Sequence, residues 1–182
     1  MRIVGLDLSL ARTGIAVITP EHIEAWCRET DSSKCLQERI GLMAAAVQSR
    51  VVTPGTHVFI ENHSFGSFGA GKTQLAELAG VVKVGLWERR IPFALVAPNT
   101  LKKWVLGFGG KSDKSMILHR IALKTGFEPL NDDEADALAL ADFGWHVLNP
   151  ESPRRELLQY EKDTIAAFLS PKVKKPRKRK AD

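Results

Sequence analysis

The stretch GLDLSLARTGIAV, residues 5–17, decides how the first half of this 182-residue chain folds. It contains the end of one run of alternating, β-forming residues, Arg2–Ser9, and the start of a second, Thr13–Thr19. A third run, His22–Arg28, follows after another short connection. Three such runs predict an antiparallel meander of three strands, with Asp7 inside the otherwise apolar first strand.

Beyond the meander, helix and strand patterns alternate along the chain. Two segments have apolar residues at helical spacing, and each is followed by a short apolar strand. The predicted helix Lys34–Val51 precedes the strand His57–Asn62, and the predicted helix Gln74–Arg90 precedes the strand Pro92–Ala97. We expect the second of these strands to be buried. Three more helices are predicted: one capped by Asn99 or Thr100 and ending at Leu106, one over Ser112–Thr125, and one over Asp132–Val147 behind a capping box of Asn131 and Glu134. This order predicts an α/β fold with a mixed five-stranded sheet flanked by helices.

The composition is that of one globular domain, with 44% hydrophobic and 26% charged residues. It excludes a multidomain enzyme, a fibrous repeat and a fully disordered chain. No apolar run reaches the roughly 18 residues of a membrane span, and no secretory leader is evident. The two cysteines, Cys27 and Cys35, fit free thiols in a reducing compartment. We therefore expect a cytoplasmic protein without a membrane partner.

Charge is distributed unevenly along the chain, although its net value is only +5. Residues 83–124 carry nine lysines and arginines against two acidic residues, residues 125–171 carry three against ten, and residues 172–182 carry seven against one. We expect a main domain over residues 1–150, a helical extension over 151–169 and a disordered basic tail over 170–182. The tail could add salt-sensitive affinity for DNA, or it could serve only solubility or localisation.

Four carboxylates stand where strands end and where a helix begins. Asp7 lies in the first strand, Glu61 ends the strand VFIE, and Asp133 and Asp136 share one face of the helix that starts near residue 132. If they converge, their oxygens suit Mg²⁺ or Mn²⁺, and two such ions about 3.5–4 Å apart can hydrolyse a phosphodiester. Each also has a purely structural interpretation: a solvent-facing strand residue, a charge at a loop entry, or acids that favour a helix N-terminus.

These motifs together resemble a known family. GLDLSLARTGIAV resembles the opening G-x-D-x-[GS]-x-x-x-T-G hairpin of the RNase H-like superfamily, particularly the RuvC Holliday-junction resolvases. FIENHSFG (59–66) is similar to their second motif, residues 74–117 to their central helix, strand and Gly-x-Gly loop, and DDEADALALA (132–141) to their closing helix. The likeness spans about residues 1–147, with four motifs in the same order.

The resemblance implies an RNase H-like fold and a structure-selective endonuclease that cuts four-way DNA junctions by paired symmetric nicks. It implies a homodimer, with branched DNA as its partner and no small-molecule cofactor. It also implies that Asp7, Glu61, Asp133 and Asp136 bind two Mg²⁺ ions, with Mn²⁺ as an alternative. The products would carry a 5′-phosphate and a 3′-hydroxyl.

Candidate DNA contacts follow from the basic segment 83–124, which the resemblance implies is the DNA-facing surface. Four lysines there are the best phosphate contacts: Lys102, Lys103, Lys111 and Lys114. Lys72 is a fifth candidate. The family carries a junction-probing aromatic residue where this chain has Ser64, so Phe65 and Phe68 are wedge candidates, with core packing as the alternative. This departure and the basic tail favour a divergent member, phage-type in character, which would act in the host cytoplasm.

Features of the sequence also suggest three other functions. GSFGAGKT (66–73) fits the nucleotide-binding P-loop expression, but several strands precede it and no strand ending in aspartate follows. The sugar-kinase and actin superfamily has a similar hairpin but needs roughly twice this length. A non-catalytic protein that binds branched DNA remains a third interpretation, which the four filled acidic positions argue against.

Overall fold

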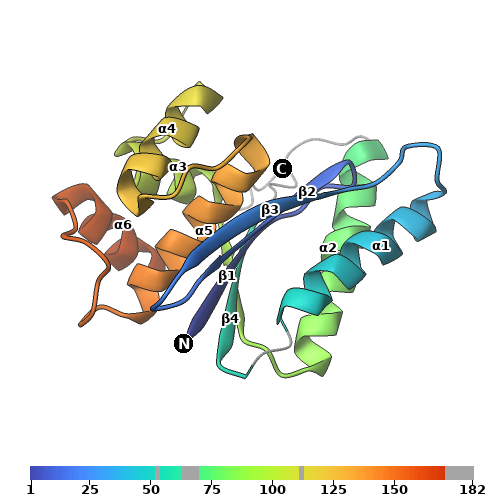
Figure 1. Ribbon diagram of the computed structural model, residues 1–182, viewed down its shortest axis with the longest axis horizontal. Helices are drawn as coiled ribbons and strands as arrows, with labels where there is room; N and C mark the ends of the chain where they lie inside the picture. The colour runs from blue at the N-terminus through green and yellow to red at the C-terminus, as the bar shows by residue number, and fades with distance from the viewer. Residues whose placement is uncertain (52–53, 63–69, 111–112, 171–182) are drawn as a thin grey trace, which may run out of the picture.

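A computed structural model describes residues 1–51, 54–62, 70–110 and 113–170 (Figure 1). Its strands are β1 (Arg2–Asp7), β2 (Arg12–Ile18), β3 (Ile23–Glu29), β4 (Thr56–Glu61) and β5 (Phe93–Val96). They form one sheet in the order β3-β2-β1-β4-β5. The first three are antiparallel, whereas β4 is parallel to both β1 and β5. The predicted mixed sheet and its antiparallel meander are therefore confirmed.

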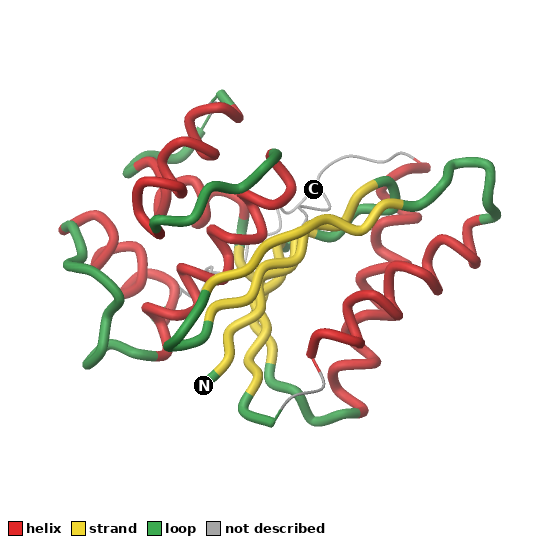
Figure 2. Tube along the Cα trace, viewed as in Figure 1, coloured by secondary structure: helices red, strands yellow, loops and turns green. Residues whose placement is uncertain are grey.

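Helices cover both faces of the sheet. They are α1 (Leu36–Val51), α2 (Ala70–Glu88), α3 (Pro98–Leu106), α4 (Lys114–Thr125), α5 (Asp132–Leu148) and α6 (Gln159–Leu169). Figures 1 and 2 show α1 and α2 together on one face and α5 on the other, with α3, α4 and α6 beside it. Alternate residues of β1 enter the two cores: Ile3 packs on the α5 side, and Val4 and Leu6 pack on the α1–α2 side.

Two glycines let α5 lie unusually close to the sheet. A Cβ at Gly5 of β1 would stand 2.0 Å from the carbonyl oxygen of Ala137, and one at Gly14 of β2 would stand 2.0 Å from that of Asp133. Any side chain at either position would therefore push the helix away. These contacts fix the first turns of α5 over the ends of β1 and β2 where Asp7 and Gly14 pair.

The structure corrects several local predictions. The strand expected to be buried, β5, is the sheet edge, and Phe93 and Leu95 are both more than a third exposed. Helix α3 begins with Pro98 after Ala97, without a side-chain cap from Asn99 or Thr100. Asp113, rather than Ser112, caps α4.

The capping box of α5 is half confirmed. The Asn131 side chain accepts from the Glu134 N–H as predicted, at 3.1 Å, but the Glu134 carboxylate accepts from the backbone N–H of Leu130.

Cys27 and Cys35 are free thiols. Burial and the negative charges of nearby Glu134 and Asp133 raise the pKa of Cys27 to about 11. Among the described residues, no helix is long and apolar enough to cross a membrane.

Candidate active site

Asp7 and Glu61 lie side by side at one end of the sheet. In the parallel pairing of β1 with β4, Leu6 stands opposite Ile60, so the next residue of each strand is one of these acids. Because Leu6 and Ile60 both pack on the α1–α2 side, strand alternation turns Asp7 and Glu61 towards α5. The strand register therefore places these two acids next to one another, as convergence of the carboxylates would require.

The hairpin after Asp7 is held by its own side chains. The Thr13 hydroxyl, which is fully buried, donates to the Ser9 carbonyl at 2.6 Å and accepts from the Ser9 N–H at 3.1 Å. The Ser9 hydroxyl accepts from the N–H of Ala11 at 3.2 Å. The serine and threonine of the motif therefore fix the turn that follows Asp7.

Asp136 is close enough to Glu61 to change its ionisation. Burial and the negative charge of Asp136 raise the pKa of Glu61 from about 4.5 to about 7, and the positive charge of Lys102 opposes them. A carboxylate whose charged form is disfavoured in this way gains strongly from a cation. The donors are oxygens only, which is the chemistry that Mg²⁺ and Mn²⁺ prefer.

Asp133 faces a different partner. Its Oδ2 accepts from Nε of Arg12, the first residue of β2, and Arg12 Nη1 also lies 3.9 Å from a carboxylate oxygen of Glu29. The hydrogen bond that Arg12 donates to Asp133, together with the negative charge of that carboxylate, raises the pKa of Arg12 above its ordinary value. In the part of the chain that the structure describes, no three Asp, Glu, His or Cys side chains are arranged to hold a metal ion. The oxygen donors therefore suit divalent ions. However, Asp133 is paired with Arg12, so the four carboxylates do not all surround one point.

Two of the predicted DNA-contacting lysines lie on α3, near this end of the sheet. Lys102 donates from Nζ to the carbonyl of Gly110 at 3.0 Å and is electrostatically coupled to Glu61. Lys103 is exposed. Gly107 and Gly110 have φ angles of 87° and 122°, which favour glycine, so the loop after α3 needs these residues for its shape.

The other predicted contacts are less fully described. Lys72 belongs to the first turn of α2 and Lys114 to the first residue of α4, but their side chains lie outside the described part of the structure. Phe65, Phe68 and Lys111 lie outside the described residues altogether. Their proposed roles stay predictions.

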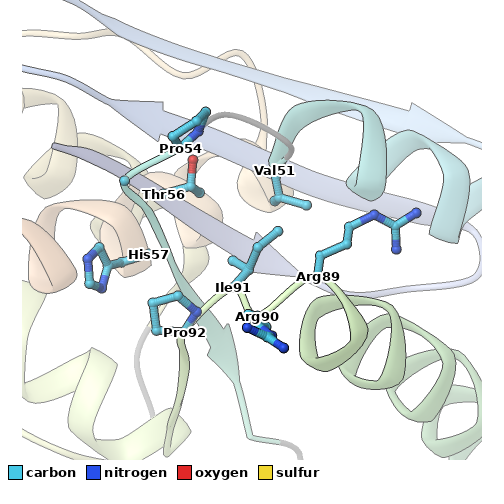
Figure 3. Close-up of a pocket in the computed structure, with 9 residues that line it drawn as sticks. Val51, Pro54, Thr56, His57, Arg89, Arg90, Ile91 and Pro92 are labelled. Atoms are coloured by element: carbon cyan, nitrogen blue, oxygen red, sulfur yellow. The ribbon is translucent and has the colours of Figure 1, made fainter.

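The described basic residues of segment 83–124 lie in different parts of the structure. Lys124 is withdrawn into an ion pair with Glu161, at 2.7 Å, so the prediction is wrong for this residue. Arg89 and Arg90 line a pocket of about 510 Å³ with Thr56, His57 and Pro92 (Figure 3). That pocket lies where β4 and β5 begin, at the opposite end of these strands from the carboxylates. Among the described residues of this segment, it is Lys102 on α3 whose positive charge acts on Glu61.

Sequence reasoning missed Arg12. A single arginine opening an otherwise apolar strand, five residues after Asp7, was the available signal. Its partner Asp133 lies 121 residues away in sequence, so only the packing of α5 against the hairpin identifies the pair.

Comparisons with known proteins agree with this geometry. A family model described as crossover junction endodeoxyribonuclease RuvC matches residues 3–142. The RuvC proteins of Ruegeria pomeroyi and Zymomonas mobilis are each 29% identical over 147 residues, covering 78% of this chain and 88% of theirs. The Thermus thermophilus RuvC structure aligns with a TM-score of 0.65 at 22% identity, covering 78% of this chain and 91% of that one. A second structure of that protein, in complex with a Holliday junction substrate, gives the same TM-score at 20% identity, covering 78% and 90%.

Proposed function

Because this chain belongs to the RuvC family of crossover junction endodeoxyribonucleases and has its RNase H-like fold, we propose that it resolves four-way DNA junctions by paired symmetric nicks. Each nick would leave a 5′-phosphate and a 3′-hydroxyl. The observation that carries this proposal is the pair Glu61 and Asp136, whose mutual repulsion at the end of the sheet favours the binding of a cation. We propose that this chain acts in the cytoplasm, which is the host's if the protein is phage-encoded.

The proposed metal ligands are Asp7, Glu61, Asp133 and Asp136, binding two Mg²⁺ ions or Mn²⁺ in their place. Such ions would supply an activated water and stabilisation of the departing 3′-oxygen. Asp7 would be a ligand in the middle of this set, because β1 is the central strand, between the strand of Glu61 and the hairpin strand that α5 covers. Lys102 would hold a scissile-strand phosphate near the carboxylates and limit their repulsion of it.

The proposed DNA surface extends from Lys102 and Lys103 to Lys72, Lys111 and Lys114, with Phe65 and Phe68 as wedges into the junction. Support comes from α3, which presents an exposed Lys103 at the same end of the sheet as Glu61. Phosphate contacts make the logarithm of DNA affinity fall with the logarithm of the salt concentration. The slope is roughly proportional to the number of contacts. Replacing Lys103 by alanine should therefore weaken junction binding and make its salt dependence shallower.

A homodimer is proposed through the outer face of α2. Val81, Val84 and Trp87 recur every three residues and are 43%, 55% and 75% exposed. An apolar stripe with so exposed a tryptophan fits a second copy of the same helix, and two copies would offer one active site to each of two symmetric strands. Trp87→Glu should yield a monomer in analytical ultracentrifugation. A dimer of unchanged affinity would place the interface elsewhere.

The test of the function is cleavage of a labelled four-way junction and a matched linear duplex, with Mg²⁺ or EDTA, by the wild type and by Asp7→Asn. We expect paired symmetric nicks in the junction only, with metal only and by the wild type only. Junction binding without cutting in Mg²⁺ or Mn²⁺ would favour a non-catalytic branched-DNA-binding protein instead.

Apart from the motif itself, nothing in the described residues favours the P-loop interpretation. Residues 66–69 of GSFGAGKT lie outside the described structure, and the family match runs through the whole stretch. ATP turnover that disappears in Lys72→Ala would reverse this conclusion.

A further inference from the structure

The ion pair between Arg12 and Asp133 joins two rigid elements at the proposed metal site. Arg12 opens β2 and stands opposite Glu29 of β3 in the sheet register, so its backbone is held on a paired strand. Asp133 lies in the first turn of α5, and its carbonyl oxygen packs against Gly14, two residues from Arg12. Both backbones are therefore fixed close to one another. The packing of α5 on the hairpin sets these backbone positions, while the side chains of Arg12 and Asp133 are 41% and 21% exposed.

The ion pair engages the carboxylate of Asp133, which is one of the proposed metal ligands. Arg12 Nε donates to Oδ2 of Asp133, and in the described residues no three potential ligands are arranged around one point. Asp133 and Asp136 are three residues apart on one helix face, so a change of the Asp133 rotamer can turn its carboxylate towards Asp136 without moving the helix. That change breaks or loosens the bond to Arg12.

We propose that Arg12 is a positioning residue that holds Asp133 out of the metal site until divalent metal competes for it. Arg12 thereby sets the metal concentration at which the site assembles. This inference rests on the proposed function, because it assumes that the carboxylates at this end of the sheet bind the ions. It deepens that proposal by assigning a regulator of metal affinity to a residue that is not itself a ligand.

The test measures Mn²⁺ binding by isothermal titration calorimetry to the full-length protein without DNA. Removing the competitor in Arg12→Gln should tighten Mn²⁺ binding about tenfold, equivalent to about 1.4 kcal/mol. Junction cleavage should then reach half its maximal rate at a correspondingly lower metal concentration. Arg12→Lys, which keeps the charge, should lie between wild type and Arg12→Gln. The matched control is Arg28→Gln, which removes an exposed positive charge from the neighbouring strand and should leave Mn²⁺ affinity unchanged.

A double-mutant cycle separates the specific pair from general charge repulsion. In an Asp133→Asn background, Arg12→Gln should change Mn²⁺ affinity at least threefold less than it does in the wild-type background. Equal effects in both backgrounds would overturn the inference, because they would mean that Arg12 acts only as a nearby positive charge. Weaker Mn²⁺ binding by Arg12→Gln would also overturn it, since Arg12 would then orient Asp133 for the metal.

Failure of this inference differs from failure of the proposed function. If wild-type protein binds Mn²⁺ and cuts junctions but Arg12→Gln has wild-type affinity, only the role of Arg12 is lost. If wild-type protein binds no Mn²⁺ at all, the metal site and the proposed function fall together. Circular dichroism and thermal unfolding of each variant establish that it is folded before its affinity is interpreted.

Discussion

Glu61 at the end of β4 and Glu161 in the first turn of α6 are both withdrawn from solvent, and their surroundings act on them in opposite directions. Burial and Asp136 raise the pKa of Glu61 to about 7. Burial also acts to raise the pKa of Glu161, but hydrogen bonds from Arg155 and Lys124 outweigh it and hold the pKa below its ordinary value.

Glu161 belongs to a closed network. It is fully buried and bound in a fork by Arg155, with both nitrogen–oxygen distances at 2.8 Å. Lys124 Nζ and the Leu158 N–H complete its shell, at 2.7 and 2.8 Å. Arg155 continues to Asp142 at 3.3 Å, and Asp142 accepts from the indole N–H of Trp104 at 2.9 Å. The network ties α6 to α3, α4 and α5.

The difference shows that burial alone does not identify a functional carboxylate. A glutamate surrounded by cations and hydrogen-bond donors is a structural anchor. In a glutamate beside a second carboxylate, repulsion destabilises the charged form, and a bound cation can relieve this repulsion. Glu161 also lies beyond the matched residues 3–142, so the anchor belongs to a part of the chain that the family model does not include. Glu61 belongs to the proposed site and Glu161 to the scaffold, so we expect variants of the two glutamates to behave in opposite ways.

The largest expected effect is on cutting. Glu61→Gln should reduce junction cleavage by about a thousandfold or more, because a proposed metal ligand is lost, while junction binding is unchanged or tighter. Gel-shift and cleavage assays on one protein preparation measure both. Cleavage at the wild-type rate would remove Glu61 from the active site.

The next effect is on folding. Glu161→Gln should lower the free energy of unfolding by about 3 kcal/mol, because Lys124 and Arg155 lose the charge that compensates them in a buried setting. Urea denaturation measures the change, and Glu156→Gln, which alters an exposed glutamate near the same helix, is the matched control. Equal stability of the two variants would show that the network contributes little.

The pH dependence of stability should separate the two glutamates further. Glu61 has a raised pKa when folded, so its contribution is present below about pH 4.5 and is lost as the pH rises to about 7. The metal-free protein should lose about 1–3 kcal/mol over this range through this group. In Glu61→Gln that loss should be absent, and at pH 8 this variant should be more stable than the wild type. A pH–stability curve identical to that of the wild type would contradict the assigned ionisation.

The smallest effect concerns Lys102. Its positive charge lowers the pKa of Glu61, so Lys102→Met should move the Glu61 titration to higher pH. A carbon-13 NMR titration of labelled glutamate side chains, assigned with Glu61→Gln, measures the shift. A titration that moves down or stays in place would show that Lys102 does not act on Glu61.

Local patterns in the sequence predicted the sheet and the acids at its strand ends, because strand alternation and motif order are encoded within short segments. They did not predict that β5 is exposed, because its exposure follows from its place at an edge of the sheet, where it pairs with β4 alone. They also did not predict two side-chain pairs: the hydrogen bond from Arg12 to Asp133 and the buried ion pair of Lys124 with Glu161. Each joins side chains far apart in sequence, so only the packed fold determines whether such a charge faces DNA, a metal site or an internal partner.

The most direct test of the contrast is the thermal unfolding midpoint at pH 8 with and without Mg²⁺, measured for wild type, Glu61→Gln and Glu161→Gln. A ligand that binds only the folded protein raises its midpoint, and a gain of about 1–2 kcal/mol corresponds to roughly 3–6 °C for a chain of this size. We predict this rise in the wild type and in Glu161→Gln, and little or none in Glu61→Gln. An equal rise in all three proteins would contradict it, because the cation would then bind without the carboxylate of Glu61.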